Sequence, residues 1–186
     1  MKITQACLIE ALQDESNAMV RYQQFSKIAE QEGFANVAYL FKALVATEKV
    51  HQKNHLRALG DITFDKIKGS WSVGNTTDNL RQAFAGETEE YKKGYPDLIK
   101  KIRKEGNDNY QKVAILSMSW SRDAEKTHSQ VLALALKAVE SGNDLDVDQI
   151  YVCKVCGNLI IDKKYLNTVC LVCGHDPLFY ELIKRV

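Results

Sequence analysis

The chain has 186 residues, of which 45% are hydrophobic and 26% charged, and its net charge is +1. This length allows one good core and a small appendage, and the balanced charge gives no reason to expect nucleic acid or an anionic membrane as a partner. No apolar run approaches the ~20 residues of a membrane span, and acidic residues come too early for a signal peptide, so we expect a cytoplasmic protein.

Four long segments carry the hydrophobic period of an α-helix, and they predict helices over about 4–32, 35–59, 77–105 and 109–141. Thr77 and Asp78 are expected N-caps of the third helix, and Gly94 and Pro96 predict a kink within it. The connection over residues 60–76 is long for neighbouring antiparallel helices but suits a crossover along the bundle. We therefore predict an all-α four-helix bundle of the ferritin-like type.

The end of the chain differs from the rest. Residues 143–150 are polar and acidic, and residues 151–186 are β-leaning and contain four of the five cysteines. A domain this small needs a metal to fold. We expect a bundle over 1–142, a linker over 143–150 and a small β-rich metal domain over 151–186.

Every predicted helix carries one or two charged or imidazole side chains on its core face, near its middle. Such groups are costly there unless they are paired or bound to metal. Antiparallel packing brings the helix midpoints to one depth, so these side chains should meet. They are Glu15 in the first helix, Glu48 and His51 in the second, Glu87 and Glu90 in the third, and Glu125 and His128 in the fourth.

Two of the helices carry the pattern Glu-x-x-His, as Glu48/His51 and Glu125/His128. Residues at i and i+3 share a helix face, so the carboxylate can bridge two metals while the imidazole binds one. Single glutamates from two helices plus Glu-x-x-His from the other two is the ligand pattern of di-iron bundles. One such pair alone is usually a solvated helix face, but two in phase with the core predict a di-iron site. His55 has no glutamate three residues before it and is assigned no role.

Two cysteine knuckles, Cys153-x-x-Cys156 and Cys170-x-x-Cys173, are each followed by a glycine. Four thiolates suit either zinc or a single iron, and the spacing does not choose between them. A structural zinc ribbon is the alternative. Next to a di-iron site that needs electrons, a redox-active iron is favoured.

These motifs resemble the rubrerythrin family over nearly the whole chain. The last domain is similar to the family's shortened rubredoxin domain, although Leu171 stands where many members have proline. The motifs that carry the resemblance are the two Glu-x-x-His pairs, the two cysteine knuckles, Glu15-Ser16 with Arg21-Tyr22, and Gly86-Glu87-x-x-Glu90 with Tyr95-Pro96.

The resemblance implies a homodimeric peroxidase that reduces hydrogen peroxide to water and protects against oxidative stress. Electrons would come from NAD(P)H through a separate donor, such as rubredoxin or an NAD(P)H-dependent reductase, to the cysteine-bound iron and then to the di-iron site. The implied exchange on oxidation replaces His51 by Glu90, and Tyr22 and Tyr95 would bond to ligand carboxylates. The implied di-iron ligands are Glu15, Glu48, His51, Glu87, Glu90, Glu125 and His128.

Two other functions stay open: a ferritin-like ferroxidase or iron-handling protein, and a zinc-ribbon adaptor. The first needs a cage-forming surface, and the second would be colourless. The linker allows the cysteine domain either to fold back along its own bundle or to reach a partner. By resemblance we expect the second placement, with electrons passing between chains.

Overall fold

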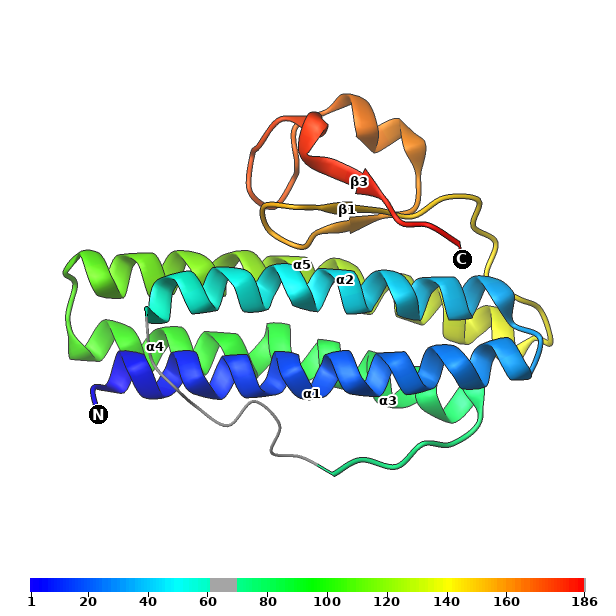
Figure 1. Cartoon of the computed structure of the whole chain (residues 1–186), viewed down its shortest axis with the longest axis horizontal. Coiled ribbons are helices and arrows are strands. Elements are labelled where there is room, and N and C mark those ends of the chain that lie inside the picture. The colour runs from blue at the N-terminus through cyan, green and yellow to red at the C-terminus, as the bar shows by residue number, and fades with distance from the viewer. Residues whose placement is uncertain (61–69, 186) are drawn as a thin grey trace.

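The chain folds into a long helical bundle with a small domain on one side, as the computed structural model shows for residues 1–60 and 70–185 (Figure 1). Since α3, η1 and α4 follow one another without a break, they form one rod, and the predicted four-helix bundle is confirmed. Within these described ranges, no helix is long and apolar enough to cross a membrane. The helical elements are α1 (Ile3–Gln31), α2 (Ala35–Leu59), α3 (Thr76–Glu89), the π-helical turn η1 (Glu90–Gly94), α4 (Tyr95–Glu105) and α5 (Asn109–Glu140).

The helix α2 ends at one end of the bundle, and α3 begins at the other (Figure 1). The two helices therefore point the same way, as a ferritin-like crossover requires. Residues 61–69 of the predicted crossover lie outside the described residues. The N-cap of α3 differs from our expectation of Thr77 or Asp78. Asn75 has the extended backbone of a cap, and its side chain accepts a hydrogen bond from the Asp78 N–H at 2.9 Å.

The predicted kink near Gly94 and Pro96 is the π-helical turn η1. In this turn the N–H of Tyr95 donates to the carbonyl of Glu90, five residues earlier. An α-helix would rotate two such residues about 140° apart, whereas the wider π turn keeps them closer to one face. Pro96 has no N–H to give, so the regular ladder is interrupted here in any case. The extra residue lets Glu90 and Tyr95 line the same cavity.

Two apolar clusters fill the bundle on either side of its polar middle. Phe25 and Phe41 belong to one cluster, and Leu8 and Met118 to the other; all four are completely buried. The polar middle of the bundle thus lies between two buried apolar regions. Unpaired charge is expensive in such a place, so its residues must be compensated by one another or by metal.

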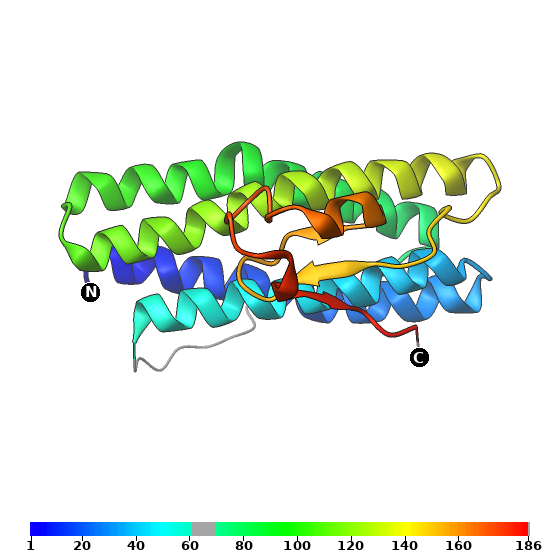
Figure 2. The same ribbon diagram turned by 90° about the horizontal axis from the view of Figure 1, so that it is seen from above.

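The small domain contains an antiparallel sheet in the order β2-β1-β3. Tyr151 of β1 pairs with Ile160 of β2 on one side and with Leu182 of β3 on the other. The domain lies over the middle of the bundle, with β1 against α2 and β2 against both α2 and α5 (Figures 1 and 2). Its elements are β1 (Tyr151–Cys153), β2 (Leu159–Ile160), the 3-10 turns η2 (Lys163–Asn167) and η3 (Pro177–Phe179), and β3 (Tyr180–Leu182).

The linker returns this domain to its own bundle, which differs from our expectation that it reaches a partner chain. Asp144 accepts hydrogen bonds from the N–H groups of Asn36 and Val37, at 2.7 and 3.1 Å, where α2 begins. Leu145 and Val147 are buried in the same cluster as the bundle core. An extended linker would leave these side chains in water, so apolar burial favours the folded-back path.

Candidate metal centres

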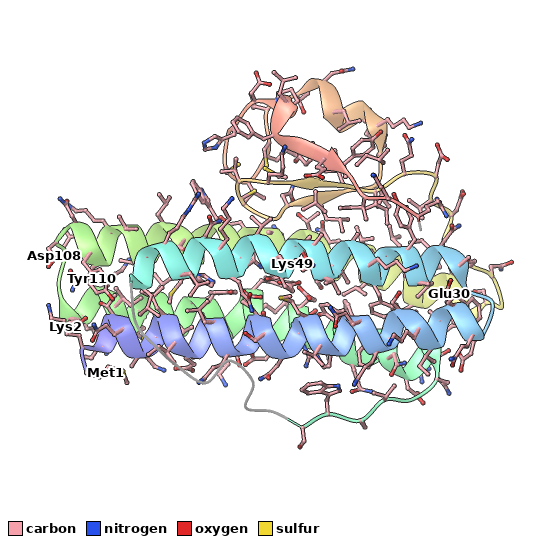
Figure 3. All side chains as sticks on the ribbon, viewed as in Figure 1. Met1, Lys2, Glu30, Lys49, Asp108 and Tyr110 are labelled. Atoms are coloured by element: carbon pink, nitrogen blue, oxygen red, sulfur yellow. The ribbon has the colours of Figure 1, made fainter. Side chains whose placement is uncertain are left out.

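Polar residues of α1, α2, α3 and α5 meet in the middle of the bundle, at a depth that Lys49, the neighbour of Glu48, marks on α2 in Figure 3. They form two overlapping groups, and within each group the potential ligand atoms all lie within 4.8 Å of one another. The shared members, Glu48 and Glu125, stand between two metal positions, as bridging carboxylates do. The groups are Glu15, Glu48, His51 and Glu125, and Glu48, Glu87, Glu125 and His128.

Both histidines turn their Nδ1 atoms toward the carboxylates. Nδ1 of His51 lies 2.9 Å from Oε2 of Glu48 and 2.9 Å from Oε1 of Glu125. Nδ1 of His128 lies 2.6 Å from Oε2 of Glu125 and 3.3 Å from Oε2 of Glu87. The two rings stack with their centroids 5.7 Å apart. Each Glu-x-x-His pair therefore offers its carboxylate and its imidazole to one place, as the i, i+3 spacing predicted.

The outer carboxylates are held by tyrosines. Tyr22 donates to Oε1 of Glu87, and Tyr95 donates to Oε1 of Glu15. Oε2 of Glu15 is buried without a hydrogen-bond partner among the described residues, whereas Oε2 of Glu87 and Oε1 of Glu125 each face a ring nitrogen, of His128 at 3.3 Å and of His51 at 2.9 Å. Buried carboxylate oxygens without donors are costly, and cations satisfy them. The donor set therefore fits a di-iron site.

Crowding shifts the pKa values of these carboxyl groups in opposite directions. Burial and the charge of Glu125 raise the pKa of Glu48 well above its ordinary value, and burial and the charge of Glu87 do the same for Glu125. Burial also acts to raise the pKa of Glu15, but His51 outweighs it and holds that pKa well below the ordinary value. Two cations bound between these carboxyl groups would favour their ionised forms and so displace protons.

Glu90 belongs to neither group of ligand atoms. Burial, together with the charges of Glu125 and Glu15, raises its pKa well above the ordinary value, which shows that it lies beside them. It faces a cavity of about 60 Å³ that Gly94 and Tyr95 also line. Glu90 is therefore not placed as a ligand in this structure, and its expected role as a ligand applies to another state of the site.

The four cysteine sulfurs converge in the small domain. The Sγ atoms of Cys153 and Cys173 lie 3.8 Å apart, and those of Cys156 and Cys170 lie 3.6 Å apart. A tetrahedron with metal–sulfur bonds of about 2.3 Å has edges of about 3.8 Å, so the thiolates fit one metal ion. Cys173 is partly exposed, whereas the other three are buried. One edge of this site therefore reaches the surface.

Gly157 connects the two metal sites. It follows Cys156 in the first knuckle, and its carbonyl oxygen accepts a hydrogen bond from Nε2 of His128 at 3.0 Å. A proton on Nε2 leaves the Nδ1 lone pair of His128 free for a metal. The φ angle of Gly157 is +81°, and a Cβ here would lie 2.4 Å from Nε2 of His51. Glycine is therefore required at this contact.

Sequence reasoning missed His55, which is completely buried beside the site. Its Nε2 lies 3.1 Å from the hydroxyl of Tyr95, and its Nδ1 lies 2.7 Å from Oγ of Ser117. Burial lowers its pKa, so the ring is neutral. The available signal was its place one helical turn after His51, on the same face of α2.

The fold and the two donor sets define a ferritin-like bundle with a di-iron site and an attached rubredoxin-like iron site. The family model for rubrerythrin matches residues 7–137. This chain belongs to the rubrerythrin family. It is therefore an oxidoreductase of rubrerythrin type, with a role in the response to oxidative stress.

Relatives match almost the full chain. Rubrerythrin-2 of Clostridium acetobutylicum is 30% identical over 163 residues, which are 86% of this chain and 85% of that protein. The rubrerythrin of Porphyromonas gingivalis is 30% identical over 185 residues, which are 97% and 90% of the two chains. The structure of nigerythrin in a mixed-valence state superposes with a TM-score of 0.83 over 96% of this chain and 86% of that one, at 24% identity. That likeness shows a shared fold, including the small domain.

Proposed function

We propose that this chain is a peroxide reductase that converts hydrogen peroxide to water, with electrons delivered through its own cysteine-bound iron. The observation that carries the proposal is the hydrogen bond from Nε2 of His128 to the carbonyl oxygen of Gly157, the residue next to Cys156. It joins the two metal sites through the side chain of Cys156, the backbone as far as the Gly157 carbonyl, and one hydrogen bond. A turnover enzyme needs such a supply of electrons, whereas an iron store does not.

We also propose seven residues as the ligands of the di-iron site. Two ferrous ions bound there would supply the two electrons that reduce the O–O bond, and two protons complete the conversion of one peroxide to two waters. Glu48 and Glu125 lie between the metal positions, and Glu90 takes the place of His51 in the oxidised site, as the family resemblance implies. The seven are Glu15, Glu48, His51, Glu87, Glu90, Glu125 and His128.

The cavity between α1 and η1 gives the substrate a place beside these ligands. Its volume of about 60 Å³ is lined by Asp14, Glu90, Gly94 and Tyr95, among others. A water molecule needs only about 10–15 Å³ of such space, so hydrogen peroxide fits. Burial, together with the charges of Glu125 and Glu15, raises the pKa of Glu90 well above its ordinary value. We propose Glu90 as the group that exchanges protons with peroxide in this cavity.

The separate electron donor, rubredoxin or an NAD(P)H-dependent reductase, is proposed to approach the exposed edge of the cysteine site. Cys173 is partly exposed there, and Leu171 and Leu178 are 78% and 87% exposed. Apolar side chains around a redox centre suit a transient protein contact. The homodimer is also a proposal, and it is supported by membership of the family.

The test is stopped-flow mixing of the fully reduced protein with hydrogen peroxide and, separately, with dioxygen. We expect peroxide to oxidise the di-iron site much faster. A faster reaction with dioxygen, together with assembly into a large cage, would instead support the ferroxidase alternative. A colourless protein that retains one zinc after expression in iron-rich medium would support the zinc-ribbon adaptor.

A further inference from the structure

His55 lies at the crossing of α2, α4 and α5, where it contacts the di-iron site through another residue. Its Nε2 is 3.1 Å from the hydroxyl oxygen of Tyr95, and its Nδ1 is 2.7 Å from Oγ of Ser117. A second hydroxyl, that of Ser121, is more distant, at 3.4 Å from Nε2. The ring is completely buried, and Oε1 of Glu15 itself lies 3.6 Å from the same Nε2, farther away than the hydroxyl oxygen of Tyr95.

The order of protons along this chain of contacts follows from Glu15. Tyr95 donates its single hydroxyl proton to Oε1 of Glu15. The phenol oxygen can therefore only accept from His55, which places the ring proton on Nε2. Nδ1 is then an acceptor, and the hydroxyl of Ser117 donates to it. Each donor in this series of hydrogen bonds, which runs from Ser117 through His55 and Tyr95 to Glu15, thus has one acceptor.

The other half of the site has the same tyrosine–glutamate pair without a histidine behind it. Tyr22 donates to Glu87, but its ring packs against Phe25 and Phe41, with centroids 6.3 and 5.8 Å away. Apolar packing restrains the ring of Tyr22 without directing its hydroxyl proton. Tyr95 is directed by a hydrogen bond, so the two halves of the site are supported differently.

We propose that His55 is a positioning residue of the di-iron site: it directs the Tyr95 hydroxyl to Oε1 of Glu15 and so keeps Oε2 of Glu15 free for a metal. Oε2 is buried and has no hydrogen-bond partner in the described part of the chain, as this assignment requires. The inference rests on Glu15 as a metal ligand, which is part of the proposed function, but it does not depend on peroxide as the substrate.

The experiment uses the full-length, iron-loaded protein and measures the rate at which a ferrous chelator removes the di-iron irons, with the red cysteine-bound iron as an internal count. Outer partners of metal ligands are typically worth about 10–100-fold in affinity or activity, so His55→Phe should speed iron loss about tenfold or more. His55→Gln keeps an N–H donor near the position of Nε2 and should restore most of the retention. Ser117→Ala should have a smaller effect, and Ser121→Ala, which removes only the longer contact to the ring, should have the smallest.

Tyr95→Phe separates positioning from general packing. If His55 acts through Tyr95, adding His55→Phe to Tyr95→Phe should cause no further iron loss. Additive effects of the two changes, or a His55→Gln protein that loses iron as fast as His55→Phe at unchanged thermal stability, would overturn the proposal. Should His55→Phe fail to fold, equal iron loss from Ser117→Ala and Ser121→Ala would overturn it instead. The chelator assay contains no peroxide. Its result therefore tests the role of His55 even if the protein proves to have no peroxidase activity.

Discussion

Gly157 lies directly against the ring of His51. A Cβ on this glycine would be 2.4 Å from Nε2 of His51 and 3.2 Å from the carbonyl oxygen of Thr47. The backbone of the first cysteine knuckle therefore packs directly against α2, and the space between them is too small for a side chain at position 157. Contact between the two metal sites depends on this absence of a side chain.

Gly157→Ala should weaken the docking of the small domain. The left-handed backbone costs a non-glycine residue about 1–2 kcal/mol, and the collision with His51 should add about 1–3 kcal/mol. Urea denaturation measures the total loss, and stopped-flow reduction of the di-iron site measures the slower relay. Gly174→Ala is the matched control, because Gly174 also follows a knuckle and has φ of +71°, but no atom of the described residues lies within 4 Å of its Cβ position. Equal losses from both variants would contradict the contact.

Electron transfer within one chain predicts the behaviour of mixed dimers. In the proposed homodimer, one chain carries Cys170→Ser and the other carries Glu125→Ala, so no single chain has both metal sites intact. Since the cysteine domain lies on its own bundle, this dimer should be as inactive as either parent. Peroxidase assays on the purified mixed dimer check this result. Partial return of activity would show that electrons cross between chains.

Metal content should follow the two donor sets. The fully loaded protein should hold about three irons per chain, two in the bundle and one on the cysteines. Glu125→Ala removes a shared carboxylate and should lose the bundle irons while the red colour remains. Glu90 is outside both ligand groups, so Glu90→Ala should retain most iron but turn over more slowly. Iron analysis with an optical spectrum tests both, and loss of all bundle iron from Glu90→Ala would contradict its assigned place.

Asp14 predicts a pH dependence of stability in protein whose bundle site is free of metal. Asp14 is exposed, but the protein atoms around its carboxyl group partly desolvate it, and this desolvation, followed by the charges of Glu15 and Glu10, raises its pKa from 3.8 to about 6. The unfolded chain therefore loses this proton first as pH rises, and the native state is penalised increasingly between about pH 4 and pH 6. Asp14→Asn should stabilise the protein by about 1 kcal/mol at pH 7, after allowance for solvent screening, and by almost nothing at pH 4. Urea denaturation at the two pH values measures the difference, and an equal effect at both would contradict the shift.

The ligand groups were predictable because helical phase and antiparallel packing are local rules. Glu48 and His51, three residues apart, must share a face wherever their helix packs. The π turn was not predictable, since Gly94 and Pro96 indicate an interruption but not its kind. The place of the small domain was decided by contacts between distant residues, such as Asp144 with Asn36, which no local pattern encodes.

His55 was missed for a related reason. A lone histidine in a helical stripe is usually a core residue, and its partners Tyr95 and Ser117 are 40 and 62 residues away in sequence. Only the packing of α2 against two other helices brings them together. Polar networks of this kind are specified by three-dimensional neighbours rather than by spacing.

The shared apolar cluster has a consequence for how the chain denatures. Ile150, Val152 and Leu159 are buried in the same cluster as Phe25 and Phe41 of the bundle. Neither part can melt without exposing surface of the other, so the chain should behave as a single cooperative unit. Iron bound to the cysteines would then stabilise the helices by mass action. A reductant or chelator that strips that one ion would lower the melting temperature of the whole molecule.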